Sequence, residues 1–323
     1  MYFLDAHSDL LTHTARKRAK GLRGNLLRDH LPGLLKGNVR GLLAVLWISV
    51  EYTDDPKKRF EELLPLISDE LAESAAEIRP VRSAAELEQA ERDNMPYLIL
   101  GIEGASGFPQ GLDTLRRVHS LGYRHLGLTW NEENEFATGV GSPNLERGLT
   151  ELGREAVNLA EKLGILLDVS HLNEKSFWDF LEASRKPFVA SHSNARSLCP
   201  AERNLTDQQI RVIARRGGVI GMNAWGDFVR SDQKPTLDDL VRHIDHMVNL
   251  GGIESVGCGF DFCDYFGKDP TVESDRNIPA IVSFEGSEDV PKLGEALQKH
   301  GYSPEQIEKI AFRNMRRVLM ETI

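Results

Sequence analysis

The chain has 323 residues, of which 41% are hydrophobic and 27% are charged, the balance of a soluble globular protein. Its formal net charge of -10 argues against a nucleic-acid-binding surface, and no apolar run is long enough to cross a bilayer. We therefore expect neither a nucleic acid nor a membrane as a partner. The N-terminus carries no signal-peptide pattern and the three cysteines cannot all pair, so a reduced, cytoplasmic location is the expectation.

Apolar runs typical of buried strands alternate with amphipathic segments along the chain. The predicted strands cover residues 3–6, 41–50, 97–102, 125–129, 166–169, 188–190, 218–223 and 255–260. The predicted helices cover residues 57–78, 112–121, 149–163, 173–184, 206–216, 235–249, 290–299 and 303–319, and Ser83 opens a further short helix. Residues 13–40 are predicted to be helical and then to form a glycine-rich loop. Residues 262–284 form a polar connection long enough for a lid or a substrate-binding loop.

Three helix ends carry recognisable signals. Asn173 is predicted to cap the helix that follows it, and Thr206 with Gln209 predicts a capping box. Gly164 is a residue type that commonly ends a helix. These signals fix the helix boundaries around the strands that matter most for function.

The segment 166–194 predicts one strand–helix–strand unit, with His171 following the first strand and His192 following the second. The two strands must be parallel, so both histidines are expected at the same edge of the sheet. A single histidine after a strand is more often a hydrogen-bonded loop residue than a metal ligand. Two in one such unit favour a shared site.

The other predicted strands also end in polar side chains. His7 and Asp9 are two residues apart after the first strand, and on extended backbone they would point to the same side, although this pattern alone is common. Glu103 follows a fully apolar strand, where burial requires either a cation or a salt bridge. The remaining strands end at Trp130, His171, His192, Asn223 and Asp261.

Eight strand-then-helix units in one chain predict a (β/α)8 TIM barrel of the metal-dependent hydrolase type. We expect one domain over residues 1–323, closed by C-terminal helices. In a barrel all these strand ends open on one face, which brings three histidines and three carboxylates together. Such a set suits Zn²⁺ or a similar divalent ion, and it holds more ligands than one tetrahedral ion uses. Two metal ions are the predicted number.

Other histidines and one acid have simpler interpretations. His243 and His246 are predicted to lie on an exposed helix face, because nothing nearby in the sequence completes a metal site. His13, His30, His119, His125 and His300 also lack a position at a strand end. Asp168 could orient a metal ligand or, equally well, cap a turn.

Several segments together resemble the membrane dipeptidase (renal dipeptidase) family of zinc metallopeptidases, which have an amidohydrolase-like barrel. The segments are DAHSDLL (5–11), GIEGA (101–105), LLDVSH (166–171), FVASHSNAR (188–196), AERN (201–204) and VGCGFDF (256–262). They occur in the family's order and at compatible spacing. The resemblance covers nearly the whole chain.

The resemblance implies a binuclear zinc dipeptidase that uses a metal-bridging hydroxide to cleave dipeptides with a free C-terminal carboxylate. His7 and Asp9 would hold one ion, His171 and His192 the second, and Glu103 would bridge both. The remaining implied roles belong to two further residues. Asp261 would act as general base and then acid, and Arg203 would bind the substrate carboxylate with its planar guanidinium. A surface position is the simpler interpretation of Arg203 without the resemblance.

One position departs from the mammalian members of that family. Their fourth strand ends in a histidine that helps to bind the substrate, whereas this chain has Trp130 followed by Asn131. An indole offers one N–H donor and cannot carry a charge. Trp130, Asn131 and Asn223 are therefore predicted to contact the substrate in other ways. The change argues against broad-range dipeptide or β-lactam hydrolysis.

Two alternative functions fit the same residues. A related hydrolase acting on N-acyl amino acids or small amides would use the same metals and the same arginine. A catalytically inactive metal-binding homologue is suggested only by Trp130, and the presence of Asp261 argues against it. Family members are often dimers, so the resemblance also allows a homodimer. Substrate side chains, D or L preference and the metal in the cell cannot be inferred from the sequence.

Overall fold

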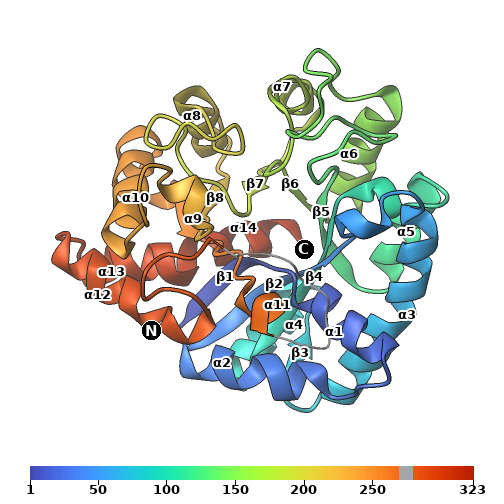
Figure 1. The fold of residues 1–323 in the computed structure, drawn as a ribbon, viewed down its shortest axis with the longest axis horizontal. Helices are drawn as coiled ribbons and strands as arrows, with labels where there is room; N and C mark the ends of the chain where they lie inside the picture. The colour runs from blue at the N-terminus through green and yellow to red at the C-terminus, as the bar shows by residue number, and fades with distance from the viewer. Residues whose placement is uncertain (269–278) are drawn as a thin grey trace.

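Eight parallel strands close into a barrel, which confirms the predicted fold (Figure 1). The computed structural model describes residues 1–268 and 279–323. The barrel strands are β1 (Phe3–Ser8), β2 (Val39–Trp47), β4 (Tyr97–Glu103), β5 (Tyr123–Gly127), β6 (Leu166–Asp168), β7 (Val189–Ala190), β8 (Val219–Met222) and β9 (Val256–Cys258). Neighbours in the ring follow the order β1-β2-β4-β5-β6-β7-β8-β9, and β9 pairs back to β1.

One strand was not predicted. β3 (Arg79–Pro80) pairs with Tyr97–Leu98 at the start of β4, and β5 takes over the pairing with β4 from Leu100 onward. The two-residue β3 therefore lies outside the ring. It is too short to produce a periodic apolar pattern in the sequence.

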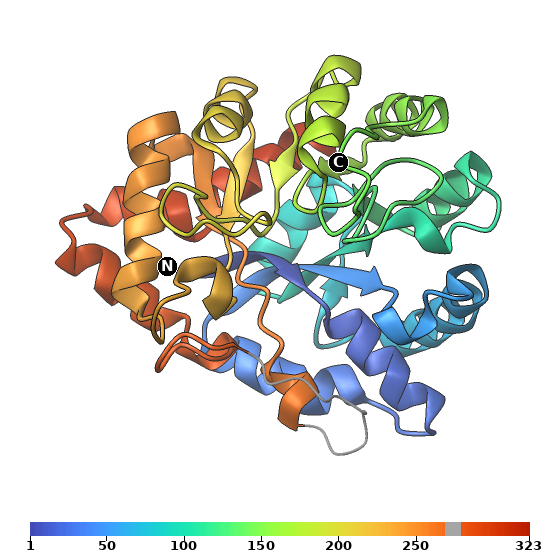
Figure 2. The same ribbon diagram turned by 45° about the horizontal axis from the view of Figure 1, so that its top comes forward.

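Helices form an outer layer around the strands, as Figures 1 and 2 show. They are α1 (Leu10–Ala19), α2 (Leu31–Lys36), α3 (Pro56–Ser74), α4 (Ala84–Arg92), α5 (Leu112–Ser120), α6 (Glu151–Leu163), α7 (Glu174–Ala183), α8 (Asp207–Arg215), α9 (Gly226–Val229), α10 (Leu237–Gly251), α11 (Asp264–Lys268), α12 (Pro291–Lys299), α13 (Pro304–Glu308) and α14 (Asn314–Thr322). Within the described residues no helix combines the length and the apolar character needed to cross a membrane.

The predicted helix signals act as expected. The Asn173 side chain accepts a hydrogen bond from the Ser176 backbone N–H, and Thr206 with Gln209 forms a complete capping box. Gly164 has the left-handed φ of 71° that glycine tolerates best. Each cap fixes where a helix begins or ends relative to the neighbouring strand.

The barrel interior is apolar toward the amino ends of the strands. Leu4, Leu43 and Ile99 belong to one buried cluster with Met315, Val318 and other residues, and these last two lie on α14. The C-terminal helix therefore packs against the amino-end side of the barrel core. Polar chemistry is left to the opposite, carboxyl ends of the strands, where active sites of this architecture lie.

Three boundaries differ from the prediction. The region after α1 is largely helical, with a π-helical turn at Leu26–His30 followed by α2, instead of a loop. The long C-terminal helix is interrupted by a second π-helical turn at Lys309–Arg313. In the predicted lid, the structure places α11 after β9, and residues 269–278 lie outside the described residues.

Candidate active site

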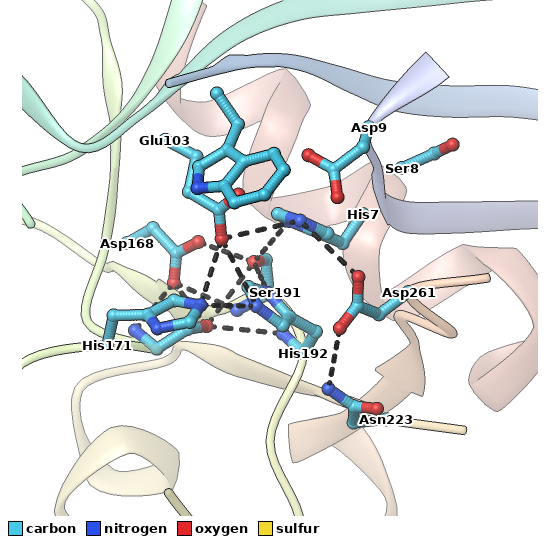
Figure 3. Close-up of polar contacts among 12 residues, drawn as sticks. His7, Ser8, Asp9, Glu103, Asp168, His171, Ser191, His192, Asn223 and Asp261 are labelled. Atoms are coloured by element: carbon cyan, nitrogen blue, oxygen red, sulfur yellow. Dashed lines mark hydrogen bonds and ion pairs between the residues drawn. The ribbon is translucent and has the colours of Figure 1, made fainter. Parts of the chain in front are cut away.

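The carboxyl ends of the strands bring the predicted metal ligands into one cluster (Figure 3). His7 lies on β1, Asp9 precedes α1, Glu103 ends β4, and His171, His192 and Asp261 follow β6, β7 and β9. Five of the six are buried, and Asp261 is 15% exposed. A cavity of about 510 Å³ opens over them.

Glu103 lies at the centre of the cluster. Its Oε1 atom is 2.9 Å from Nε2 of His171, 3.5 Å from Nε2 of His192 and 3.6 Å from Nε2 of His7. The Nε2 atoms of His171 and His192 are themselves 2.9 Å apart. One carboxylate thus faces the same nitrogen of three different histidines, which is the position expected for a bridging ligand.

His7, Asp9 and Asp261 form a second group on the other side of Glu103. Ligand atoms of these three residues lie within 4.8 Å of one another, as do those of Glu103, His171 and His192. The prediction that an extended backbone brings His7 and Asp9 to the same side is wrong, however. Asp9 is not on extended backbone but at the start of α1, with φ -78° and ψ 12°, and β1 has a register irregularity between Asp5 and Ser8. The turn, not strand alternation, brings Asp9 beside His7.

Hydrogen bonds hold the far nitrogen of each histidine. Nδ1 of His171 is 2.9 Å from Oδ1 of Asn131, and Nδ1 of His192 is 2.7 Å from Oγ of Ser191. The same Ser191 oxygen is 3.3 Å from Nδ1 of His7. Because an amide oxygen can only accept, the His171 Nδ1 carries the proton and its Nε2 lone pair faces Glu103.

Ser191 is in turn held by Asp168. The serine hydroxyl donates to Oδ2 of Asp168, and the serine N–H donates to Oδ1 at 3.0 Å. Oδ1 also accepts from the N–H of Ser170, and Nε2 of His125 lies 3.1 Å from Oδ2. Asp168 therefore has both roles that the sequence left open, since it shapes the turn after β6 and supports the residue that orients His192.

Charge and burial act in opposite directions on these groups. Burial lowers the pKa of His7, but the negative charges of Glu103, Asp261 and Asp9 outweigh this and raise it to about 10. Burial and the charge of Arg203 lower the pKa of His171 to about 4. Burial raises the pKa of Glu103, yet the adjacent His7 and His171 hold the net pKa below its ordinary value. Without metal the cluster is thus set for an anionic Glu103, a protonated His7 and neutral imidazoles at His171 and His192.

The donor set fits divalent metal ions. Nε2 of His7 is buried and has no hydrogen-bond partner among the described residues, although it faces two carboxylates. Imidazole nitrogen with carboxylate oxygen is the set that zinc and similar first-row ions prefer. Three carboxylates so close together, two of them buried and one only slightly exposed, also need positive charge to offset their repulsion.

Arg203 and Asp261 both line the cavity. Arg203 is buried, its Nη1 donates to Oγ of Ser193 at 3.1 Å, and its Nη2 donates to the His192 carbonyl at 3.1 Å. Its Nε has no partner among the described residues. Arg203 is therefore not the surface arginine that the sequence alone would suggest.

Asp261 has a left-handed backbone with φ 57°, which is uncommon for a residue other than glycine. Burial raises the pKa of its carboxyl above the ordinary value, and the charge of Glu103 adds to this effect. Nδ2 of Asn223 donates to Oδ2 of Asp261 at 3.2 Å. Backbone strain of this kind is found where a side chain must be aimed precisely at a ligand.

The predicted substrate-contacting residues are divided between two positions. Trp130 and Asn131 line the cavity, and the Trp130 ring lies 6.1 Å from the ring of His171. Asn223 is fully buried beneath Asp261 and contacts that carboxylate, and it is not among the cavity-lining residues. Direct contact of Asn223 with a substrate stays a prediction.

The prediction of an exposed face for His243 is wrong. His243 is 1% exposed, its Nδ1 accepts from the Ala195 N–H, and its Nε2 lies 3.0 Å from the Val229 carbonyl. This face of α10 is covered by α9 and the loop after β7, which sequence spacing does not reveal. His246 pairs with Asp207 at 2.8 Å, and His13 with His30 at 2.9 Å.

Some residues of the site were not assigned a role from the sequence. Ser191 and His125 had none, and Trp47, Trp225 and Phe228 were not recognised as part of the cavity wall. The only signal for Ser191 was its position directly before His192. Long-range contacts define the others.

Comparison with known proteins gives the same assignment throughout the chain. Residues 1–323 match the family model described as membrane dipeptidase, peptidase family M19. A Klebsiella pneumoniae protein described as an uncharacterized protein in the pqqA 5′ region is 36% identical over 274 residues, covering 82% of this chain and 96% of that protein.

Two solved structures are similar over the whole chain. A metallo peptidase from Rhodobacter sphaeroides, liganded with a phosphinate mimic of the dipeptide L-Ala-D-Ala, has a TM-score of 0.86 at 28% identity, covering 100% of this chain and 99% of its own. A metallo peptidase described as dipeptidase AC has a TM-score of 0.87 at 29% identity, covering 100% and 98%.

Proposed function

The chain belongs to the membrane dipeptidase family of metallopeptidases and is a hydrolase that acts on dipeptides, and from this premise we propose that it works with two zinc ions. The observation that carries the proposal is the convergence of three Nε2 atoms on one Glu103 carboxylate. His7 and Asp9 would hold one ion, His171 and His192 the other, and Glu103 would contact both. When bound, such ions lower the pKa of a water molecule and polarise the scissile carbonyl.

Arg203 would bind the C-terminal carboxylate of the substrate. Burial lowers the pKa of its guanidinium only to about 10, so it remains cationic at neutral pH. Its two Nη groups are already anchored to the protein, and the anchored guanidinium lines the cavity. A rigid, desolvated guanidinium is a strong and selective partner for a carboxylate.

Asp261 would move the proton during hydrolysis. It would take a proton from the attacking water as the new carbon–oxygen bond forms, and then give it to the amine nitrogen as the carbon–nitrogen bond breaks. Its raised pKa suits the first step, because a more basic carboxylate takes a proton from the attacking water more readily. The hydrogen bond from Asn223 keeps the carboxylate turned toward His7 and the cavity.

The distance between Arg203 and the metal cluster would limit the substrate length. Arg203 donates to the carbonyl of His192, a residue whose side chain contacts Glu103, so the carboxylate site adjoins the metal site directly. A substrate carboxylate held there would lie close to the metals, which would leave little room for chain beyond the scissile bond. This geometry supports a dipeptidase over an endopeptidase.

The test combines metal analysis with a substrate panel. We expect about two equivalents of zinc in the purified protein, loss of activity on chelation, and recovery when zinc is returned. The panel compares L,L-dipeptides, L,D-dipeptides including L-Ala-D-Ala, and N-acetyl amino acids. Turnover of N-acetyl amino acids alone would favour the related N-acyl amino acid hydrolase. Absence of any turnover at high enzyme concentration, with both ions bound, would support an inactive homologue.

A further inference from the structure

The cavity wall outside the catalytic groups is aromatic. Among the described lining residues, Trp47, Trp130, Trp225 and Phe228 make up most of this wall, together with Asn131, Val140, Gly141 and Cys263. The charged or titratable lining residues that already have a role are Asp9, Glu103, His171, Arg203 and Asp261, and the only further charged one among the described residues is Glu202. Glu202 is exposed, so water screens its charge.

The aromatic residues form two pairs. The rings of Trp47 and Trp130 have centroids 5.3 Å apart, and those of Trp225 and Phe228 are 6.3 Å apart with an angle of 28° between the ring planes. Each pair is fixed by its surroundings. Trp130 packs against the ring of His171, and the backbone N–H of Trp225 donates to Oδ1 of Asn223, which fixes the chain at this residue.

The order of strands places these pairs on opposite sides of the metal cluster. Trp47 ends β2 and Trp130 follows β5, so this pair flanks Glu103 on β4. Trp225 and Phe228 follow β8, which lies four positions from β4 in a ring of eight. One pair therefore faces the other across the mouth of the barrel.

Arg203 lies on the same side as Trp225 and Phe228. It belongs to the loop after β7, the neighbour of β8, and β7 lies four positions from β2 in the ring. The side chain of the next residue, Asn204, donates to the Phe228 carbonyl at 2.8 Å. A dipeptide whose carboxylate binds Arg203 thus has its C-terminal residue beside Trp225 and Phe228. Its N-terminal residue lies across the metals, beside Trp47 and Trp130.

We propose that the enzyme is selective for dipeptides with two apolar side chains, the N-terminal one packed on Trp47 and Trp130 and the C-terminal one on Trp225 and Phe228. The inference rests on the proposed function. Aromatic faces stabilise an apolar side chain by excluding water, whereas a buried charge without a partner is costly. A cavity of about 510 Å³ has room for two such side chains.

The test measures kcat/KM of the zinc-loaded enzyme for matched dipeptides. The set is Leu-Leu, Leu-Ala, Ala-Leu, Ala-Ala, Leu-Asp, Asp-Leu, Leu-Lys and Lys-Leu, each with an L- and a D-residue at the C-terminal position. We expect kcat/KM for Leu-Leu to exceed that for each charged dipeptide by tenfold or more. Equal turnover of charged and apolar dipeptides would overturn the inference and leave the dipeptidase function intact. Preference for a C-terminal lysine would also overturn it, because Glu202 would then set the selectivity.

Two variants separate the subsites. Trp225→Ala should reduce the ratio of kcat/KM for Ala-Leu over Ala-Ala to within threefold, while the ratio for Leu-Ala over Ala-Ala stays unchanged. Trp130→Phe should lower only the ratio for Leu-Ala over Ala-Ala. The readout is a ratio between substrates, so incomplete metal loading does not affect it. Trp178→Ala, on α7 and outside the lining of this cavity, is the matched control and should change neither ratio. Equal loss of both preferences in Trp225→Ala would contradict the assignment. If no dipeptide is cleaved by any loaded enzyme, the proposed function itself fails.

Discussion

The histidines of this site are oriented by hydrogen bonds to the ring nitrogens that face away from Glu103. Asn131 and Ser191 hold the Nδ1 atoms of His171 and His192, which turns both Nε2 atoms toward Glu103. Groups of this kind orient metal-binding histidines and raise their basicity. Asp168 completes the arrangement by accepting the Ser191 hydroxyl hydrogen. The chain thus prepares neutral, correctly oriented imidazoles before any metal ion arrives.

Glu103→Gln tests the proposed bridge. The amide keeps the shape of the side chain but removes the negative charge that three histidines and two ions would share. We expect the zinc content to fall below two equivalents and kcat to fall by at least a thousandfold. Zinc analysis and steady-state assays on the same preparation measure both effects. Near-normal turnover with full zinc content would show that Glu103 does not bridge the ions.

Arg203→Ala tests recognition of the substrate carboxylate. Loss of a desolvated, charge-assisted contact should raise KM at least thirtyfold for dipeptides with a free C-terminus. Substrates with an amidated C-terminus serve as the control, because they lack the charge and should be cleaved equally poorly by both enzymes. If the KM of the variant for dipeptides with a free C-terminus is unchanged, Arg203 does not bind the substrate carboxylate. Thermal unfolding is measured in parallel, since Arg203 also contacts the His192 carbonyl.

Among helices and strands, the sequence predicts those elements that follow a regular apolar pattern and the residues at which that pattern ends. The alternation of strands and helices identifies the barrel, and His7, Glu103 and His192 are recognisable because polar residues interrupt apolar runs at the strand ends. The two-residue β3, the burial of His243 and the aromatic walls at Trp225 and Phe228 could not be predicted. Each depends on contacts between segments far apart in the chain, which leave no local pattern. The π-helical turns escape prediction because each is a single turn of five residues, too short to produce a periodicity of its own.

The ends of β7, β8 and β9 pack so closely that the chain after β9 requires a glycine at position 259. A Cβ atom added to Gly259 would lie 1.7 Å from the Ser191 carbonyl oxygen and 3.0 Å from Cα of Gly221. Gly259→Ala should therefore lower the free energy of unfolding by about 3 kcal/mol or prevent folding, because the backbone itself must move. Activity should fall in any folded fraction, since Ser191 orients His192.

Gly33→Ala is the matched control for this substitution. Its added Cβ would meet no atom within 4 Å, and Gly33 lies in α2 without a positive φ. Stability should stay equal or rise by up to about 1 kcal/mol, as for alanine in place of glycine within a helix. Urea denaturation of both variants in the zinc-free state measures the difference. Equal stability of the two variants would contradict the proposed close packing.

For the whole molecule, metal binding and stability are linked through the charge at the barrel mouth. The chain carries a net charge of -10, and three of its carboxylates lie together in this cluster. Without metal, His7 supplies the compensating positive charge, which is why its pKa rises to about 10. Metal ions would replace that proton, because a histidine must be neutral to bind a metal. Uptake of metal should therefore release protons.

This linkage predicts a stability difference that depends on pH. In the zinc-free protein the pKa of His7 is raised from 6.5 to about 10, so its contribution to stability is complete below pH 6.5 and is lost as the pH rises through 10. His171, with its pKa lowered to about 4, is already neutral over this range. In the zinc-loaded protein His7 would be neutral throughout and would contribute no such dependence. The gain in Tm on adding zinc should therefore grow steadily from pH 6.5 to pH 9.

Differential scanning calorimetry of zinc-free and zinc-loaded samples at matched ionic strength measures this gain. Calorimetric titration at pH 7.5 in buffers of different ionisation enthalpy counts the protons released, and His7→Asn should release about one fewer than the natural chain. His246→Asn is the control, because His246 pairs with Asp207 far from the cluster and should leave the count unchanged. A zinc-induced Tm gain that stays constant across this pH range would show that His7 does not hold the compensating proton.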